Sequence, residues 1–300
     1  MRVLVIGKNG QLGRSIHKKV NADDEIHQNL NADEFVFVGR NELSLSSDSD
    51  IAQYFNNNDD FDIIINCAAY TSVDEAEEQV TLANQVNHLA IKKLAHIANS
   101  QQAKLIHIST DYVFDGNSDQ PYLESDIPNP INIYGKTKLA GEQALQMIMP
   151  TNGIIIRTSW VFSEFGTNFV KSMLRLGRER SELNVVSDQI GSPTFATDLA
   201  ETILKISRSE NKEQPTEIYH YSNDSEACWH EFAQAIFKIA EIECNIIPIT
   251  TANYLAFVAA RPLNTVLNNT KIIKKFGIKS KCYKESLSEC LDLLRGRTLG

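Results

Sequence analysis

The stretch VLVIGKNGQLG (residues 3–13) decides the fold of this chain. It opens with a continuous apolar run rich in β-branched side chains, which predicts a strand that is buried on both faces. Glycines follow at positions 7, 10 and 13, and Leu12, Ile16 and Val20 then repeat at the four-residue spacing of one helix face. A strand, a glycine turn and a helix in direct succession predict the first unit of a parallel α/β sheet.

The glycine turn has the spacing G-x-x-G-x-x-G, a variant of the dinucleotide-binding fingerprint. Glycines let the backbone turn sharply and approach a pyrophosphate, while the start of the next helix supplies free N–H groups and the positive end of its dipole. The alternative is a tight turn with a purely structural role. We expect a dinucleotide to be bound by the residues of the turn, Gly7, Asn9, Gly10, Gln11, Leu12 and Gly13.

Apolar runs and helical patterns alternate through the first half of the chain, which predicts a doubly wound parallel Rossmann sheet of the α/β class. Apolar runs predict strands at residues 35–38, 63–65, 105–108 and 154–156. Helical stripes lie at 86–97 and 134–149. Further along, the patterns predict a strand at 183–186 and helices at 197–206 and 229–240.

The ends of the second and third strands bear on the cofactor. Dinucleotide folds often place an acidic residue after the second strand to bind the ribose 2′-hydroxyl of NAD, but here Arg40 stands there. Arginine can pair with the 2′-phosphate of NADP, so we expect NADPH, with NADH as the alternative. Small residues open the end of the third strand to a ligand, at Ala68 and Ala69 before Tyr70. Ser72 and Glu75 then fit a helix capping box.

The length of 300 residues favours two units rather than one core. We expect an NADP-binding Rossmann domain from residues 1–161 and 182–213, and a smaller α+β substrate-binding lobe from 162–181 and 214–300. Such a lobe closes a cleft over the strand ends and buries a small-molecule substrate. The candidate contacts from this side are Asn168, Phe169, Gln189 and Arg261.

Composition excludes several classes of function. The formal net charge of −9 argues against sequence-independent nucleic-acid binding, which needs a basic surface. The five cysteines form no Cys-x-x-Cys pair, and the histidines form no cluster, so we expect neither a disulfide framework nor a metal site. The chain shows neither a signal peptide nor an apolar run long enough to span a membrane. We therefore expect a cytoplasmic protein that binds neither nucleic acid nor membrane.

Hydroxyl and amine side chains follow the fourth strand in an order that suits carbonyl reduction. Thr110 ends that strand, and Tyr134 and Lys138 lie four residues apart on a predicted helix. A nearby ammonium lowers the pKa of a phenol, which would make Tyr134 a usable general acid near neutral pH. Thr110 can donate a hydrogen bond to the same carbonyl oxygen. Of the nine tyrosines only Tyr134 has lysine four residues on, so these three residues are the predicted catalytic set.

Together these motifs resemble the extended short-chain dehydrogenase/reductase family, and within it the reductases of dTDP-linked 4-keto-6-deoxysugars. The resemblance runs over nearly the whole chain and is carried by GKNGQLG (7–13), NCAAYTSVDEAE (66–77), STDYVFDG (109–116), YGKTKLAGE (134–142), RTSWVF (157–162), NFVKSMLRL (168–176), DQIGSPT (188–194) and ARPLNT (260–265). It implies NAD(P)H-dependent reduction of the C4 keto group of dTDP-4-dehydro-6-deoxy-L-mannose to dTDP-L-rhamnose, a precursor of polysaccharides.

The resemblance also implies roles for single residues. Tyr134 would donate the proton, Lys138 would bind the cofactor ribose and lower the Tyr134 pKa, and Thr110 would replace a family serine. Asp111, Tyr112 and Trp160 would line the sugar site. The dinucleotide contacts would be residues 9–12, Arg40 and residues 68–70. From the residues alone, Trp160 can equally be core packing, and Arg261 either a diphosphate ligand or a surface charge.

The chain departs from the resemblance at one position. Some relatives carry a glutamate just after the glycine loop, tied to a magnesium ion at a dimer contact, whereas this chain has Arg14 and Ser15. We therefore expect no bound metal, and a homodimer of that kind stays open. Two rival interpretations remain: a reductase of another nucleotide-linked 4-ketosugar, and a non-catalytic NADP-binding regulatory subunit of the same fold.

Overall fold

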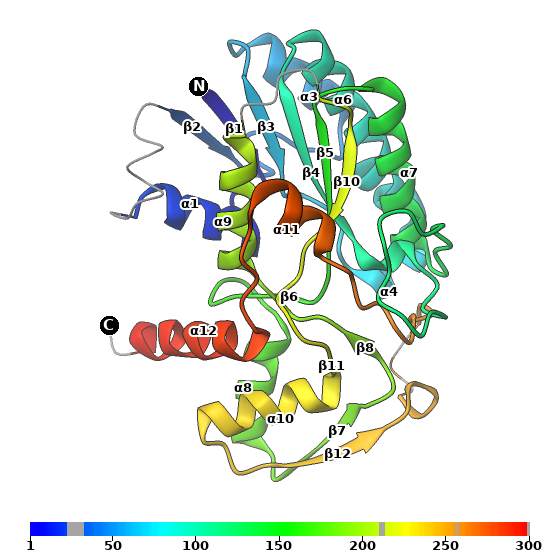
Figure 1. Cartoon of the computed structure of the whole chain (residues 1–300), viewed down its shortest axis with the longest axis vertical. Helices are drawn as coiled ribbons and strands as arrows, with labels where there is room; N and C mark the ends of the chain where they lie inside the picture. Colours follow the sequence, from blue (N-terminus) through cyan, green and yellow to red (C-terminus); the bar gives the residue numbers. More distant parts are fainter. Residues whose placement is uncertain (23–32, 210–213, 255, 257, 299–300) are drawn as a thin grey trace.

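A six-stranded parallel sheet forms the centre of the main domain, and a smaller lobe lies below it (Figure 1). The structure, a computed structural model, describes residues 1–22, 33–209, 214–254, 256 and 258–298. The strands of the main sheet are β1 (Arg2–Ile6), β2 (Glu34–Val38), β3 (Ile63–Asn66), β4 (Lys104–Thr110), β5 (Gly153–Thr158) and β10 (Glu217–His220). Their order is β10-β5-β4-β3-β1-β2, with every neighbouring pair parallel. This confirms the predicted doubly wound α/β sheet.

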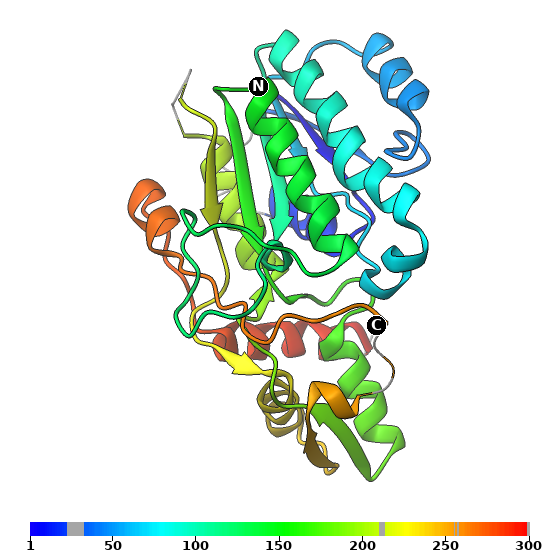
Figure 2. The same ribbon diagram turned by 90° about the vertical axis from the view of Figure 1, so that its right-hand side faces the viewer.

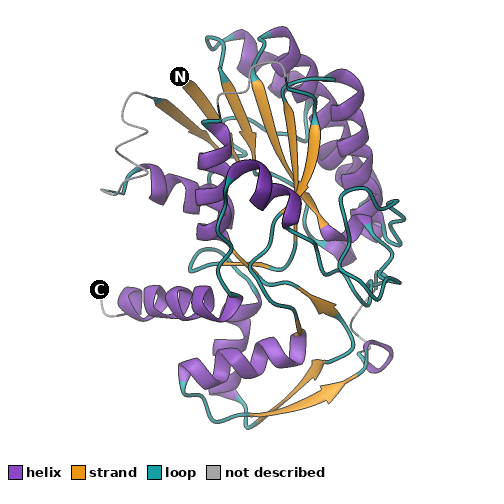
Figure 3. Cartoon of the chain, in the orientation of Figure 1, coloured by secondary structure: helices purple, strands orange, loops and turns teal. Residues whose placement is uncertain are grey.

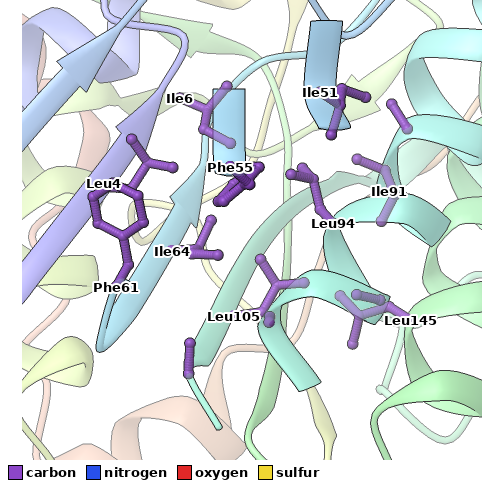
Figure 4. Close-up of a cluster of buried hydrophobic side chains, with 14 of the residues drawn as sticks. Leu4, Ile6, Ile51, Phe55, Phe61, Ile64, Ile91, Leu94, Leu105 and Leu145 are labelled. Atoms are coloured by element: carbon purple, nitrogen blue, oxygen red, sulfur yellow. The ribbon is translucent and has the colours of Figure 1, made fainter. Parts of the chain in front are cut away.

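Helices cover both faces of the sheet (Figure 3). One face carries α3 (Asp48–Asn56), α6 (Ala90–Ser100) and α7 (Ile133–Ile148), and the other carries α1 (Gln11–Val20), α9 (Ala196–Ser207) and α11 (Thr270–Phe276). Because side chains alternate along a strand, Leu4 and Ile6 face the first helix layer while Val3 and Val5 face the second. Figure 4 shows the first of these cores, where Leu4 and Ile6 lie near the α3 and α6 side chains. Strands buried on both faces therefore read as continuous apolar runs.

The lobe is built from helices and short strand pairs, and Figure 2 shows it as a separate layer beneath the main domain. Its helices are α8 (Phe169–Glu179), α10 (Trp229–Ala240) and α12 (Tyr283–Thr298), and its parallel pair is β7 (Glu182–Val186) with β12 (Asn245–Ile249). Two further pairs of short strands are β6 (Val161–Phe162) with β9 (Thr194–Phe195), and β8 (Ile190–Gly191) with β11 (Ala227–Cys228). Phe162, Phe195 and Phe232 form the centre of the lobe's own core.

Three elements belong to a different unit from the one predicted for them. β10 falls within 214–300 but forms the edge of the main sheet, and α11 packs on that sheet through Ile272. β7 falls within 182–213 but pairs with β12 in the lobe, with Leu183 opposite Ile246. The chain crosses between the units more often than predicted, because a short strand takes its place from a partner distant in sequence. The assignment of one unit to the cofactor and the other to the substrate remains a proposal.

The segment after β3 differs from the prediction in its capping. Helix α4 (Val73–Glu78) does begin after Ser72, but the Ser72 side chain makes no capping hydrogen bond. Asp74 in its first turn instead accepts hydrogen bonds from the backbone N–H groups of Val258 and Ala259, each at 2.9 Å. Helix α5 (Val80–Asn84) and a π-helical turn (Gln85–Leu89) lead from there into α6. The predicted capping box is therefore wrong, and α4 is held by a distant loop.

Helix α7 is fixed to the sheet by a fully buried ion pair. Glu142 of α7 accepts from Arg157 of β5 at 3.0 and 2.7 Å, and both side chains are 1% exposed. The guanidinium also lies over the Phe114 ring, 5.1 Å from its centroid. Removing one partner of such a pair would leave an uncompensated charge in the interior, which is strongly destabilising.

Candidate active site

The candidate site lies where the carboxyl ends of β1, β3 and β4 meet the starts of α1 and α7. The glycine turn there depends on close backbone contacts: a Cβ on Gly13 would lie 2.2 Å from the Gly7 oxygen, and one on Gly7 would lie 2.9 Å from the Ala68 nitrogen. Gly7 also has a positive φ of 95°, which favours glycine. Gly10 is the N-cap of α1 and makes no side-chain cap bond, so the first N–H groups of α1 suit an anionic ligand.

The cofactor residues predicted around this turn share one edge of the sheet. Asn9 lies against Gly39, where its Nδ2 is 2.7 Å from the position of a Cβ on that glycine. Ala68 and Ala69 follow the neighbouring strand β3 and are partly exposed. Arg40 is exposed beyond the end of β2, which leaves its guanidinium accessible to the 2′-phosphate of a bound cofactor. The structure thus brings the predicted dinucleotide residues to one edge of the sheet.

Two features place the start of α7 against the end of β4. Asn132 caps the helix, with its Oδ1 accepting from the Gly135 N–H at 2.8 Å and its Nδ2 donating to the Ala260 carbonyl at 2.9 Å. Gly135 is required because a Cβ there would lie 2.1 Å from the Tyr112 oxygen. This contact brings Tyr134, one residue earlier, beside the segment that follows Thr110.

Tyr134 lies close to Thr110. Burial raises the pKa of Tyr134 to about 12, although a hydrogen bond with Thr110 lowers it and the charge of Asp111 raises it. The Tyr134 ring packs edge-on against Tyr112, with centroids 5.8 Å apart. The Thr110 hydroxyl donates to Asp111 Oδ1 at 3.0 Å and accepts from the Tyr112 N–H at 3.1 Å. A phenol with this pKa is protonated at neutral pH, as a proton donor must be.

Lys138 is arranged differently from the prediction. Its side chain is 1% exposed, and its Nζ donates to the Ile108 carbonyl at 2.6 Å. Burial lowers the Lys138 pKa to about 8, with the charge of Glu142 acting in the opposite direction. The raised pKa of Tyr134 traces to burial and to Thr110 and Asp111, and Lys138 is not among its causes. The direction of the Tyr134 pKa shift is set by burial, and the lowering of this pKa by Lys138 stays a prediction.

Trp160 and Phe169 lie in one aromatic cluster of the lobe, with Trp229 between them. Trp160 adopts a positive φ of 47° and stacks on Trp229 of α10, with ring centroids 3.5 Å apart and an angle of 7°. Phe169 packs on the other side of that cluster, 4.6 Å from Trp229. Gln189 is buried and accepts from Trp229 Nε1 at 3.2 Å, while its own Nε2 donates to Thr251. Trp160 is thus partly exposed and belongs to the lobe wall rather than to the sheet core.

Asn168 and Arg261 bind other parts of the protein. Asn168 is the N-cap of α8, and its Nδ2 donates to Gln11 Oε1 at 2.8 Å. The Arg261 guanidinium pairs with Asp74 at 2.6 Å and is 8% exposed. Arg261 is therefore not the solvated surface charge of the alternative interpretation. Neither position excludes a ligand, but the prediction missed the structural role of both residues.

Sequence reasoning also missed two buried polar residues behind the catalytic set. Asn87, in the π-helical turn, bonds the N–H and the carbonyl of Tyr70 at 2.9 and 3.0 Å and donates to Thr137 at 3.2 Å. It links the cofactor segment to the catalytic helix. His107 lies within β4 and contacts Lys138 Nζ at 3.3 Å. A polar residue in an otherwise apolar strand or helix stripe is the signal that could have found both.

The residues after the glycine loop do not fit a metal. The Arg14 guanidinium lies over the Phe165 ring, 4.4 Å from its centroid, and Ser15 is buried. A guanidinium offers no ligand atom to a cation. Among the described residues, no group of histidine, cysteine, aspartate or glutamate side chains could hold a metal ion. In the same part of the chain, no helix is long and apolar enough to cross a membrane.

The chain matches a known family over almost its full length. The model of the RmlD substrate binding domain family covers residues 1–295. The chain belongs to this family. A similar relative is the dTDP-4-dehydrorhamnose reductase of Aggregatibacter actinomycetemcomitans, which is 40% identical over 296 residues and matches over 95% of this chain and 97% of its own length.

Solved structures agree with this membership. A dTDP-4-dehydrorhamnose reductase from Clostridium acetobutylicum superposes with a TM-score of 0.89 at 37% identity, over 98% of this chain and 100% of its own. The enzyme of the same name from Bacillus anthracis, in complex with NADP, has a TM-score of 0.88 at 36% identity, over 97% of this chain and 98% of its own. A similar structure of the same fold has therefore been solved in complex with NADP.

The buried carboxyl of Asp111 generates a prediction about stability. Burial raises its pKa to about 6, against the action of the Thr265 and Thr110 hydroxyls. At low pH the carboxyl is neutral in both the folded and the unfolded state. Stability falls as the pH rises from the ordinary pKa of 3.8 to about 6, because the carboxyl must regain a proton on folding, and above pH 6 folding buries its charge. Asp111→Asn should therefore raise the free energy of unfolding at pH 8 by about 3 kcal/mol, with no gain at pH 4.

Denaturant unfolding at the two pH values measures this difference. Asp115→Asn is the matched control, since the hydrogen bond from Asn129 lowers the Asp115 pKa. Its free energy of unfolding should fall at neutral pH, where the charged form is stabilised in the fold. A gain for Asp111→Asn that is equal at pH 4 and pH 8 would show that burial of the charge is not its source.

Proposed function

We propose that this chain is an NADPH-dependent reductase that converts the C4 keto group of dTDP-4-dehydro-6-deoxy-L-mannose to the hydroxyl of dTDP-L-rhamnose. The observation that carries the proposal is the meeting of Thr110 and Tyr134 at the strand ends, beside the glycine turn. The family membership and the reductases named above support the same reaction. The NADP complex of the Bacillus anthracis relative supports the cofactor class.

In this reaction the protein's own residues control a proton. A bound nicotinamide cofactor supplies the hydride to the carbonyl carbon. Tyr134, protonated at neutral pH, gives its hydroxyl proton to the carbonyl oxygen as negative charge develops there. The Thr110 hydroxyl lies close enough to hydrogen-bond the same oxygen and orient it. Lys138, on the same face of α7, is proposed to bind the cofactor ribose.

The other site residues remain proposals with stated roles. Residues 7–13, Arg40 and residues 68–70 are proposed to bind the dinucleotide. Asp111, Tyr112 and Trp160 are proposed to line the sugar site, where the apolar face of an aromatic ring suits a 6-deoxy methyl group. Asn168 and Arg261 are proposed to contact the substrate, in addition to capping α8 and pairing with Asp74.

Two other functions differ in what they require. A reductase of another nucleotide 4-ketosugar would use the same catalytic residues, because these do not select the sugar. A non-catalytic NADP-binding subunit would not need Thr110, Tyr134 and Lys138 together, and their presence favours an enzyme. We propose a cytoplasmic enzyme and a homodimer as the remaining parts of the assignment.

The substrate class can be tested by following NADPH absorbance with dTDP-4-dehydro-6-deoxy-L-mannose, with other nucleotide 4-ketosugars, and with the free ketosugar. Binding energy from the nucleotide helps turnover as well as binding. The dTDP-linked sugar should therefore give a kcat/KM at least about 100-fold above the free sugar. Equal values for free and linked sugars would leave only a general carbonyl reductase.

The proton donor can be tested with Tyr134→Phe. General acid catalysis contributes about 10²- to 10⁴-fold, so the variant should lose at least about 99% of kcat. NADPH affinity, measured by fluorescence titration, should stay nearly unchanged because the phenol is needed only for the chemistry. Tyr54→Phe, which removes a hydroxyl on α3 outside the proposed site, serves as the control. If Tyr134→Phe kept more than about a tenth of the wild-type rate, Tyr134 would not be the acid.

The role of Arg40 can be tested by comparing the two nicotinamide cofactors. Arg40→Ala removes the charge that would read the 2′-phosphate, and a charge-assisted contact is worth about 1.5–3 kcal/mol. NADPH binding should therefore weaken about tenfold or more, while NADH binding changes little. Arg180→Ala, which removes an exposed charge after α8, is the matched control. An equal loss for both cofactors would contradict the assignment.

A further inference from the structure

Three buried polar side chains form a line behind the catalytic helix. Asn66 ends β3, His107 lies in β4 and Lys138 lies in α7, and their exposures are 1%, 0% and 1%. Asn66 Nδ2 is 3.1 Å from His107 Nδ1, and His107 Nε2 is 3.3 Å from Lys138 Nζ. Because all three side chains are buried, each donor needs an acceptor inside the protein.

The orientation of the Asn66 amide sets the direction of the line. The Ala68 N–H donates to Asn66 Oδ1 at 3.1 Å, which identifies that atom as the oxygen. The other end of the amide, toward His107, is therefore the NH₂ group. An amide NH₂ only donates, so His107 Nδ1 must accept and cannot carry a proton.

The state of His107 then determines what faces Lys138. Burial, followed by the charge of Lys138, lowers the His107 pKa well below its usual value, so the ring is neutral. With Nδ1 unprotonated, the single ring proton lies on Nε2 and points at Lys138 Nζ. An ammonium has three donors and no lone pair, so it would meet this N–H donor to donor. An amine, in contrast, accepts the Nε2–H and still donates to the Ile108 carbonyl at 2.6 Å.

The charges around Lys138 do not override the effect of His107 on the Lys138 pKa. Glu142, one turn further along α7, raises the Lys138 pKa, but Arg157 of β5 binds its carboxylate and offsets its charge. On the side of β4, the Lys138 amine contacts the His107 ring and the Ile108 carbonyl. Tyr134 lies one helical turn earlier, and Asp111 raises the pKa of that phenol. Burial of Lys138 acts in the same direction as the His107 N–H.

We propose that Asn66, acting through the tautomer of His107, is a positioning residue that stabilises the amine form of Lys138. The inference rests on the proposed function for its purpose. Each turnover takes one proton from the Tyr134 hydroxyl, and the phenolate must regain one. A lysine that loses a proton near working pH can supply it and recover it from water, which balances the exchange with no further reactant.

The first test reads the His107 tautomer in the wild-type protein. In protein with ¹⁵N-labelled histidine, the two ring nitrogens give separate NMR shifts for each tautomer, and His107→Gln assigns the signal among the seven histidines. The proposal requires the Nε2–H tautomer from pH 6 to 8. An Nδ1–H tautomer, or a ring that protonates in this range, would overturn it. This measurement needs neither a variant of Asn66 nor turnover.

The second test uses Asn66→Asp to reverse the direction of the hydrogen bonds from residue 66 to Lys138. The carboxylate can still accept from the Ala68 N–H, but it would accept from His107 Nδ1 as well, so Nε2 becomes an acceptor and favours the ammonium. The Lys138 pKa, followed through lysine ¹³Cε shifts and assigned with Lys138→Met, should rise by at least about one unit. Asn57→Asp, at the exposed end of α3, is the control for an added charge and should leave this pKa unchanged.

The kinetic consequence separates the proposal from a merely structural role. In Asn66→Asp, the midpoint of the Lys138-dependent limb in the pH profile of kcat should move upward with the NMR value. A lower kcat at every pH with an unmoved midpoint, or an unmoved Lys138 pKa, would overturn the proposal. Failure of the proposed substrate would leave both NMR results intact, so the two hypotheses can fail separately.

Discussion

The close backbone contact between Gly7 and Gly13 is the constraint on which the site depends. Because a Cβ at Gly13 would lie 2.2 Å from the Gly7 oxygen, only glycine lets α1 begin directly over the end of β1. The same turn lets Ala68 approach from β3. These approaches bring the start of α1 and the ends of the central strands into one crevice. An open α/β sheet binds its ligands in that crevice, at the point where the strand order reverses.

The glycine turn also holds the second lobe. Gln11 accepts hydrogen bonds from Ser163 at 2.9 Å and from Asn168 at 2.8 Å, and its Nε2 donates to the Val161 carbonyl. Since Asn168 also caps α8, the first helix of the lobe begins at a side chain of the glycine turn. The segment proposed to bind the cofactor and the lobe proposed to bind the sugar therefore share one hydrogen-bond network. Ordering of the turn by a dinucleotide would reach the lobe through Gln11.

The sequence predicts well what depends on local pattern or on the geometry of parallel sheets. The five strands read from apolar runs are all present, and Thr110 and Tyr134 meet because strand ends and helix starts share one edge. It does not predict β10, since Glu217–His220 is not a continuous apolar run and its place is set by β5, far earlier in the chain. The pairing of Arg261 with Asp74 could not be predicted from local pattern either, because the partners are 187 residues apart.

Because the charged residues around α7 are buried, they affect the protonation of Lys138 as well as the packing of the helix. A buried ion pair such as Glu142 with Arg157 recovers little net stability, because desolvation offsets the attraction, and apolar side chains could hold α7 equally well. The pair does, however, leave a carboxylate on the same helix as Lys138, and this carboxylate raises the Lys138 pKa while burial lowers it. His107 adds a neighbour whose effect depends on its tautomer. The charge of Lys138 is thus a balance of opposed contributions, and such a balance is worth its cost in stability only where a proton has to move.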